Sequence, residues 1–416
     1  MFAKYRHVSL IVRIIIGLLV GALLGLVVPQ WTWLGILGDL FIGALRAIAP
    51  LLVFFLIMTA ISNYRAGTEN HFGSVIKLYL SATFIAAVAA VVASYVFRIK
   101  LVLPKAVHVA QQAPKDLATV IKSLLVNAVA NPVDAVLQGN YLAILFWALM
   151  IGTALQMAKP VTREVMQDVT NAIQHVTQLV IEFAPLGIVG LLFSSISQNG
   201  FSGIVKYGQL VLLLVGTMAF VYLILYALMV WTVTGQNPYP LTFWTLKVSG
   251  IPAFFTRSGA VNIPINLQAC ADLGLNKESY AISIPLGGSA NSGGAAITIS
   301  IMTLAACYTL GIHVSFPLAI LLCFMSALAS TGVSGIAGGS LLIIPMAASL
   351  FGISNTTAMQ VVGVGFIIGV IQDSVETAVN SAADLLFTAA AEYHDLRKAG
   401  RPVDIIAAVH RAQAKK

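Results

Sequence analysis

The sequence predicts an all-α polytopic membrane protein. Of its 416 residues, 59% are hydrophobic and only 9% are charged, whereas soluble domains carry about 25% charged residues. Between Lys277 and Arg397 lie 119 residues with neither Lys nor Arg. Several apolar runs reach the roughly 20 residues that a helix needs to cross a bilayer. We therefore expect a single membrane domain over residues 1–416.

The first half of the chain predicts uninterrupted spanning helices. The candidate ranges are 10–29, 37–62, 74–97, 139–158, 171–198 and 205–233. Basic residues within 98–136 indicate a loop, and the pair Asn131-Pro132 breaks the chain before the next apolar run. Small residues recur every four positions in the first span, a spacing that lets helix backbones approach closely; they are Gly17, Gly21 and Gly25.

Basic residues at both ends of the chain predict its orientation. Lys and Arg cluster before the first span and in residues 392–416, and the net charge is +8. Positively charged flanks stay on the cytoplasmic side, so we expect both termini there, with 392–416 as a cytoplasmic tail and an even number of spans. The three cysteines have no spacing typical of a disulfide or a metal site.

The second half contains apolar segments that are broken in the middle. Residues 243–275 are interrupted at Arg257-Ser258-Gly259, residues 280–310 by the Gly- and Ser-rich run 287–294, and residues 315–350 by the run 330–340. Irregular backbone survives at membrane depth only where protein or a wet cavity satisfies its polar groups. A single break could be a simple kink, but paired interrupted segments indicate the binding site of a transporter.

A stripe of polar residues marks the last apolar helix, expected over 357–391. Asp373, Glu376, Asn380 and Asp384 follow one another at spacings of three, four and four. At about 100° per residue these side chains share one face of the helix. A carboxylate at bilayer depth costs about 2.5–3.5 kcal/mol on insertion scales. The stripe therefore predicts a buried site that holds a cation or a charged substrate.

The residue types around these breaks suit an amino-acid zwitterion together with Na⁺. A hard cation prefers oxygen ligands. The sequence offers them in the carbonyls near Gly287, the Asn291 and Asn380 amides and the Asp384 carboxylate. Further oxygens could come from Ser289, Ser330 and Thr331. Half-helix N-termini attract an α-carboxylate, and Asp373 suits an ammonium group. Arg257 needs a partner at depth, and Glu376 is our candidate; snorkelling to an interface is the alternative.

Two other classes of function compete with this interpretation. An intramembrane aspartyl protease needs two carboxylates that share a proton, but at about 1.5 Å per residue Asp373 and Asp384 lie about 16 Å apart on one helix. We therefore expect no enzyme. A channel or a proton-coupled carrier, with Glu376 as the proton site, stays open.

The motifs themselves resemble a known family. Phe254-Phe255-Thr256-Arg257-Ser258, the loop at Asn291, the loop 330–340 and the pattern Asp373…Asn380…Asp384 are similar to the dicarboxylate/amino acid:cation symporters, which have the glutamate-transporter fold. Within this family the resemblance is closest to the bacterial branch that carries serine and threonine with sodium, and it covers nearly the whole chain.

The resemblance implies an architecture and a mechanism. It implies eight transmembrane helices plus two re-entrant helical hairpins with inverted repeats, assembled as homotrimers in the bacterial inner membrane. The implied scaffold covers about 10–62 and 117–198, and the moving transport part about 74–97 and 205–391, with hairpins at about 243–275 and 315–350. The implied activity is sodium-coupled uptake of L-serine and L-threonine by an elevator motion, with Na⁺ as the co-transported ion. The alternative is a proton-coupled or broader neutral or acidic amino-acid carrier of the same fold.

The resemblance also implies roles for single residues. The substrate contacts would be Ser258, Gly259, Gly335, Ile336, Asp373, Glu376, Thr377 and Asn380. One Na⁺ would be held by Gly287, Asn291, Asn380 and Asp384, and another by Ser289 with the backbone of Ser330, Thr331 and Val333. Two departures stand out. Glu376 occupies the position where members for acidic substrates carry Arg, which favours a small neutral substrate, and the run 291–295 lacks the usual Met and Asp.

Overall fold

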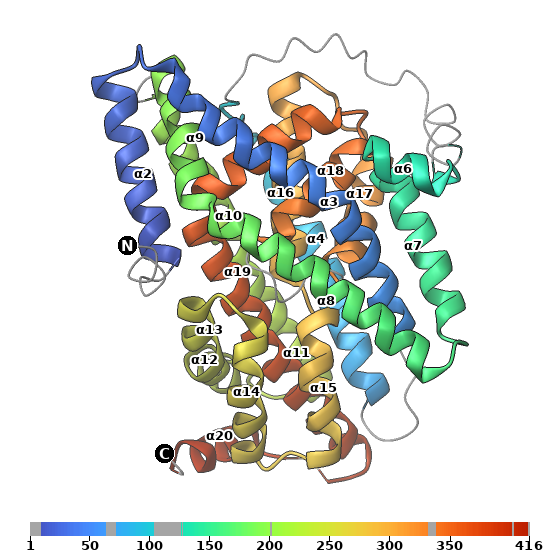
Figure 1. Cartoon of the computed structure of the whole chain (residues 1–416). Helices are drawn as coiled ribbons and strands as arrows, with labels where there is room; N and C mark the ends of the chain where they lie inside the picture. Colours follow the sequence, from blue (N-terminus) through green and yellow to red (C-terminus); the bar gives the residue numbers. More distant parts are fainter. Residues whose placement is uncertain are drawn as a thin grey trace, which may run out of the picture.

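The computed structural model describes residues 10–63, 72–103, 126, 128–199, 202–331, 338–401 and 403–414. All regular elements of these residues are helices, as the composition predicts. The helices of the first half are α2 (Leu10–Val27), η1 (Thr32–Leu34), α3 (Gly35–Asn63), α4 (Phe72–Val96), α6 (Pro132–Gln138), α7 (Tyr141–Leu155), α8 (Pro160–Glu182) and α9 (Ala184–Asn199). Helices α2, α3, α7, α8 and α9 pack mainly on one another (Figure 1).

One predicted span is bent. The range 171–198 was expected to be a single helix, but the chain bends by 51° between Pro160–Glu182 and Ala184–Gln198. The cause is Pro185, which follows the break at Phe183 and removes one helical hydrogen bond while its ring disfavours helical backbone just before it. Helix α8 starts at Pro160, before the expected start at residue 171, and it crosses the molecule obliquely (Figure 1).

The glycines of the first span lie against α9. A Cβ on Gly17 would stand 2.5 Å from the Pro185 carbonyl oxygen, and one on Gly21 would stand 2.8 Å from that of Val189. Any larger residue at either position would push the two backbones apart. These short distances confirm the close helix contact that the four-residue glycine spacing predicted.

The second half forms the hairpins and the broken helices. One long span runs through α10 (Ser202–Phe220), the π-helix η2 (Val221–Tyr226) and α11 (Ala227–Thr234). The first hairpin comprises α12 (Tyr239–Thr245), the π-helix η3 (Leu246–Gly250), α13 (Ile251–Thr256) and α14 (Gly259–Leu273). Then follow α15 (Lys277–Ala290), α16 (Gly293–Leu310), α17 (Phe316–Ser330), α18 (Gly339–Ser349), α19 (Asn355–Lys398) and α20 (Ile405–Ala414).

Two predicted breaks are therefore seen directly, at Arg257-Ser258 and at Asn291-Ser292. The third lies between α17 and α18, where residues 332–337 fall outside the described part. In the described residues, five helices are long and apolar enough to cross a membrane, or six if the bent pair α8–α9 counts as one. The eight spans and two hairpins remain an expectation of the resemblance.

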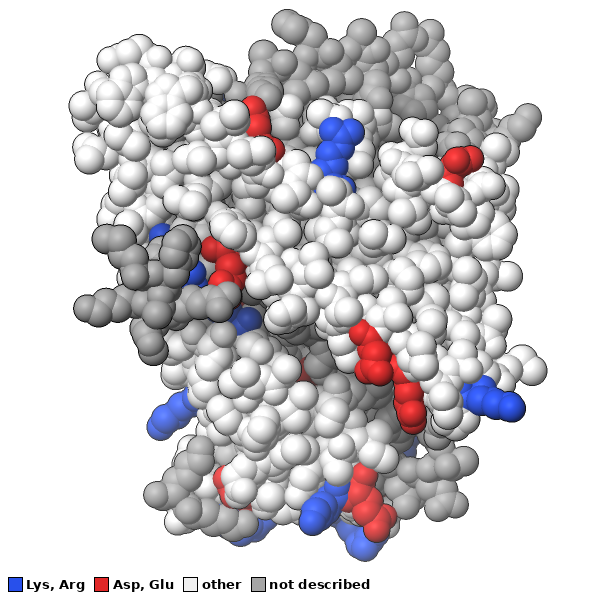
Figure 2. Space-filling view, viewed as in Figure 1, with Lys and Arg blue, Asp and Glu red and all other residues white. Residues whose placement is uncertain are grey.

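The deepest elements are α16 and α19. In the most apolar stretch of Asn355–Lys398, 78% of the residues are buried within the protein, and every residue of α16 from Gly293 to Cys307 is buried. Helices α4, α15, α18 and the first hairpin pack around this pair. Figure 2 shows a mostly uncharged face with several Lys and Arg side chains along its lower edge, where Figure 1 places α14, α15 and α20.

Candidate functional site

The turn of the first hairpin is built around Arg257. This residue has φ 51° and ψ 32°, the left-handed conformation, and it ends α13. A side chain adopts that backbone conformation only at a cost, so surrounding contacts must hold it there. Next in the chain, the Ser258 hydroxyl accepts a hydrogen bond from Val261 N at 3.4 Å and caps α14, whose first residue is Gly259.

Arg257 spans the gap to α19 and pairs with Asp373. Its Nε donates to Asp373 Oδ2 at 2.7 Å, and its Nη2 lies 2.7 Å from the same oxygen. Only 9% of the Arg257 side chain and 5% of that of Asp373 are exposed. The expected pairing of Arg257 with Glu376 is therefore wrong. The hairpin docks one helical turn before Glu376, so that Nη2 also reaches the carbonyl of Gly369 at 3.4 Å.

Asp373 also binds the second hairpin. Its other oxygen, Oδ1, accepts a hydrogen bond from the Gly338 N–H at 3.1 Å. Gly338 has φ 70° and precedes α18, so this amide points at the carboxylate from the N-terminal end of that helix, where backbone N–H groups have no helical partner. One carboxylate on α19 thus connects the turn between α13 and α14 with the N-terminal end of α18.

Little space remains beside Asp373. The cavity there measures about 10 Å³ and is lined by Arg257, Gly338 and Asp373 on one side and by residues of α2, α8 and α9 on the other. A void of this size accommodates about one water molecule. A ligand as large as an amino acid does not fit in this void.

Glu376 lies among neutral hydrogen-bond donors. Its Oε2 accepts from Thr298 Oγ1 at 2.7 Å and from Ser340 Oγ at 2.9 Å, and it also accepts from Gln372 Nε2. Gln372 Nε2 additionally donates to Thr298 at 2.8 Å. We did not predict Thr298, Ser340 or Gln372. The spacing of Gln372 and Glu376, four apart on a helix, was the available signal.

Four predicted sodium ligands lie together where α15 breaks. Asn291 N donates to the Gly287 carbonyl at 2.9 Å, and Asn291 Nδ2 donates to Asp384 Oδ1 at 2.9 Å and to the Asn380 carbonyl at 3.4 Å. Gly287 faces the same carboxylate, because a Cβ there would stand 2.7 Å from Asp384 Oδ1. Asn380 Oδ1 accepts from Gly294 N at 2.8 Å at the start of α16. Two broken half-helices and α19 thus meet at one cluster of oxygens.

One oxygen of this cluster has no hydrogen-bond partner among the described residues. Asn291 is 1% exposed, and its Oδ1 is buried without a donor. An unsatisfied buried acceptor costs about 1–3 kcal/mol, and a cation coordinated by this oxygen removes that cost. The donor set of amide, carbonyl and carboxylate oxygens fits a hard monovalent cation.

Tyr79 of α4 supports this cluster from outside. Its hydroxyl donates to the Asp384 carbonyl at 3.0 Å and lies 2.9 Å from the Thr388 hydroxyl and 3.2 Å from the Ser283 carbonyl. Tyr79 is fully buried. Its position on α4 was not predicted as part of the site, and an isolated Tyr in an apolar span offers no sequence signal.

The remaining predicted site residues do not join the Asp384 cluster or lie outside the described residues. The hydroxyls of Ser330, Thr331 and Thr377 each donate to a carbonyl of their own helix end or helix, at 2.9, 2.7 and 2.7 Å. Hydroxyls used in this way can still turn toward a ligand, but the structure does not bring them to the Asp384 cluster. Gly335, Ile336 and Val333 lie outside the described residues, as does the side chain of Ser289.

Broken helices that meet at buried carboxylates are the arrangement in which secondary active transporters bind substrate and coupling ions. The chain belongs to the sodium:dicarboxylate symporter family, whose model matches residues 10–393, and it therefore has the glutamate-transporter fold. This family consists of transporters.

Curated relatives match nearly the full chain. It is 68% identical over 412 residues to the serine/threonine transporter SstT of Lacticaseibacillus paracasei, covering 99% of this chain and 95% of the relative. It is 52% identical over 413 residues to the protein of the same name from Enterococcus faecalis, covering 99% and 98%. A third relative of that name, from Streptococcus agalactiae, is 51% identical over 388 residues, covering 93% and 96%.

Proposed function

We propose that this protein takes up L-serine and L-threonine together with Na⁺. The observation that carries the sodium part is the buried oxygen cluster of Asn291, Asp384 and the Gly287 carbonyl, in which Asn291 Oδ1 has no donor among the residues that the structure describes. The names of the relatives support the choice of substrates. One net positive charge moving inward releases about 2.3 kcal/mol per 100 mV, which suffices to accumulate a zwitterion.

In this proposal Asp373 holds the substrate ammonium group. The carboxylate already accepts hydrogen bonds from the Arg257 guanidinium and the Gly338 amide. An ammonium group is a cationic donor like the guanidinium, so it binds there once Arg257 has moved away. The α-carboxylate then binds the N–H groups at Ser258-Gly259, where α14 begins and its dipole attracts an anion. Gly335 and Ile336, which lie outside the described residues, are proposed as further substrate contacts.

Glu376 sets the preference for small neutral side chains. It lies on the same face of α19 as Asp373, one turn further on, and its donors are Thr298, Ser340 and Gln372. A second carboxylate brought there by aspartate or glutamate would be repelled at close range. A serine hydroxyl is small and can exchange hydrogen bonds with this polar group.

We further propose an elevator motion and a trimer in the bacterial inner membrane, with both termini in the cytoplasm. Helices α2, α3, α7, α8 and α9 would form the fixed scaffold, since they pack mainly on one another, and α4 with α10 to α19 would move. The small cavity beside Asp373 lies between these two groups, which supports their boundary as the place where substrate is carried across.

Uptake into proteoliposomes tests the function. Purified protein is reconstituted with K⁺ inside, and labelled L-serine uptake is measured with NaCl or choline chloride outside, at equal membrane potential. We expect uptake at least tenfold faster with Na⁺, and competition by L-threonine. Equal uptake in both salts would reject sodium coupling.

A pH gradient without Na⁺ serves as the control for the rival mechanism. Uptake that follows the proton gradient would favour proton coupling through Glu376. Inhibition by a panel of unlabelled amino acids in the same vesicles separates a serine and threonine carrier from a broader neutral or acidic one.

A further inference from the structure

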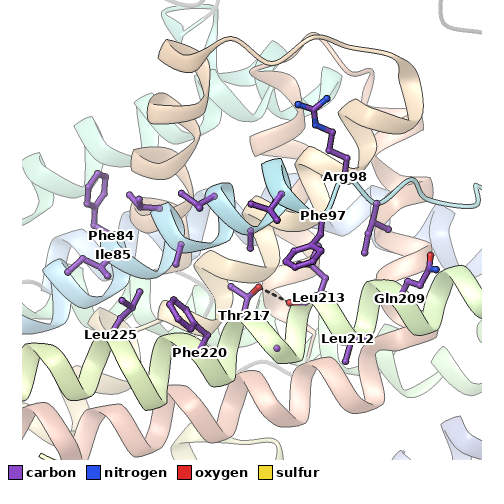
Figure 3. Close-up of a pocket in the computed structure, with 17 residues that line it drawn as sticks. Phe84, Ile85, Phe97, Arg98, Gln209, Leu212, Leu213, Thr217, Phe220 and Leu225 are labelled. Atoms are coloured by element: carbon purple, nitrogen blue, oxygen red, sulfur yellow. Dashed lines mark hydrogen bonds between the residues drawn. The ribbon is translucent and has the colours of Figure 1, made fainter.

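A wide apolar groove runs between α4 and α10, away from the carboxylate site. It has a volume of about 1200 Å³ and is lined by 17 residues of these two helices and the segments that continue them. Figure 3 shows Phe84 and Leu225 at one end of the groove and Arg98 and Gln209 at the other, so the two helices run antiparallel along it. The groove belongs to neither the substrate site nor the sodium cluster.

Small residues create the hollow. Ala89 and Gly216 lie in its lining, and a Cβ built on Gly216 meets no atom within 4 Å. Thr217 contributes no free hydroxyl, because its Oγ1 donates to the Leu213 carbonyl at 2.7 Å in the same helix, as Figure 3 also shows. The wall of the groove is therefore apolar over most of its length.

Both walls of the groove belong to helices that can span a membrane. Residues 73–96 and 205–234 are long and apolar enough to span it. Apolar side chains along the groove are strongly exposed on the protein, with Phe97 at 61% and Leu212 at 73%. Beside lipid, a hollow of this size is filled by lipid acyl chains, because in an empty apolar void the lining residues lose dispersion contacts.

One end of the groove is cationic. Arg98 lies there, exposed, with its Nε 3.4 Å from the Tyr95 carbonyl oxygen, and Gln209 lies at the same end. Lys100 follows two residues later and is also exposed. None of the lining residues is Asp or Glu. A second copy of this chain carries an excess of positive charge, +8, and complements this end poorly.

We propose that the groove binds an anionic phospholipid, with an acyl chain between α4 and α10 and the headgroup phosphate at Arg98. Arginine is suited to this role, because its planar guanidinium binds phosphate oxygens in a bidentate way. The apolar length and the cationic end together match an anionic lipid, whereas a purely apolar occupant would leave Arg98 and Gln209 without a role.

Native mass spectrometry of the whole protein tests the proposal. The detergent-purified protein is incubated with phosphatidylglycerol or phosphatidylcholine of identical acyl chains, and the bound fraction is measured as a function of lipid concentration. We expect phosphatidylglycerol to bind at least fivefold tighter. Arg98→Gln should abolish this preference and leave phosphatidylcholine binding unchanged. Equal binding of both lipids to the unaltered protein would overturn the proposal.

A matched pair of glycine variants tests the acyl-chain part. Gly216→Leu fills the groove, whereas Gly208→Leu adds the same bulk on α10 outside its lining, and both positions have open space at Cβ. Gly216→Leu should weaken binding of both lipids at least fivefold, and Gly208→Leu should not. Equal binding by the two variants would overturn the assignment, as would cysteines at Ala89 and Gly216 that cross-link to a second copy in the membrane. Because these experiments measure lipid binding, a negative result would not contradict the proposed transport function.

Discussion

Arg257 and Asp373 form a buried ion pair that fastens the first hairpin to the long helix α19, with the Nε and Nη2 atoms both 2.7 Å from one carboxylate oxygen. The second carboxylate oxygen accepts the Gly338 amide of the other hairpin. The side chain proposed to hold the substrate ammonium thus also contacts the turn between α13 and α14 and the N-terminal end of α18. In the proposed mechanism, the ammonium group would replace the Arg257 guanidinium at Asp373 Oδ2.

Replacing Asp373 by Asn should therefore have two effects. Serine binding should fall below detection, because a neutral amide cannot pair with the ammonium group. The protein should also lose about 3–5 kcal/mol of stability, since Arg257 is left buried without its partner. Calorimetry of serine binding at high Na⁺ and thermal unfolding in detergent measure the two effects.

The double variant Arg257→Gln/Asp373→Asn separates these effects. It removes both charges, so stability should recover by at least half while serine binding stays absent. Asp134→Asn, at the exposed start of α6, is the neutral control. Normal serine binding by Asp373→Asn would show that the ammonium group lies elsewhere.

Alanine substitutions at Gly287 and Gly288 test the sodium cluster, because each adds a single methyl group. In Gly287→Ala the new Cβ would stand 2.7 Å from Asp384 Cγ and Oδ1 and 2.9 Å from the Tyr79 hydroxyl. We expect the concentration of Na⁺ for half-maximal uptake to rise at least tenfold, which corresponds to about 1.4 kcal/mol. Gly288→Ala, whose Cβ meets no atom within 4 Å, should leave it unchanged. The idea fails if the two variants respond alike to Na⁺.

Asp384→Asn should mainly weaken the dependence on Na⁺. The carboxylate is the one charged ligand of the proposed cluster, and its hydrogen bond from Asn291 Nδ2 at 2.9 Å holds it toward the other oxygens. Loss of this charge should raise the half-saturating Na⁺ concentration at least tenfold, and serine affinity at saturating Na⁺ should change by less than threefold. Glu278→Gln, on the exposed first turn of α15, is the control. An unaltered Na⁺ titration in Asp384→Asn would remove this residue from the cluster.

Glu376→Gln should broaden the choice of substrate. The amide is nearly the same size as the carboxylate and can still accept from Thr298 and Ser340, so the fold should be retained. Without the negative charge, L-aspartate should inhibit labelled serine uptake at least fivefold better than in the unaltered protein. Aspartate that inhibits both proteins equally would show that Glu376 does not select against acidic side chains.

Periodicity predicted the acidic face of α19 because the spacing along a helix alone decides which residues share a face. The breaks at Arg257 and Asn291 were predicted differently, from the interruption of apolar segments by Arg257-Ser258-Gly259 and by the Gly- and Ser-rich run 287–294. The choice of Asp373 over Glu376 as the partner of Arg257 could not be predicted in this way. Those carboxylates differ by one helical turn, and only the docking of the hairpin on α19 decides between them.

The neighbours of Glu376 and Asp384 escaped prediction for a related reason. Thr298, Ser340 and Tyr79 come from three different helices, and each is an ordinary polar residue in an apolar segment. Nothing in their local sequence indicates a shared site. The bend at Phe183 could have been predicted from Pro185. Mean hydropathy does not detect such a bend, because the segments on both sides of it are amphipathic or apolar.

Tyr79 gives the fold one further property. Its single hydroxyl touches the Asp384 carbonyl, the Thr388 hydroxyl and the Ser283 carbonyl, so α4 registers the local geometry of both α15 and α19. In the proposed mechanism, an ion bound at Asp384 and Asn291 would shift these groups, and the Tyr79 contact would pass the shift on to α4. The fluorescence of a dye attached to an exposed position of α4, such as Val92, would then report cation binding even when no substrate is transported.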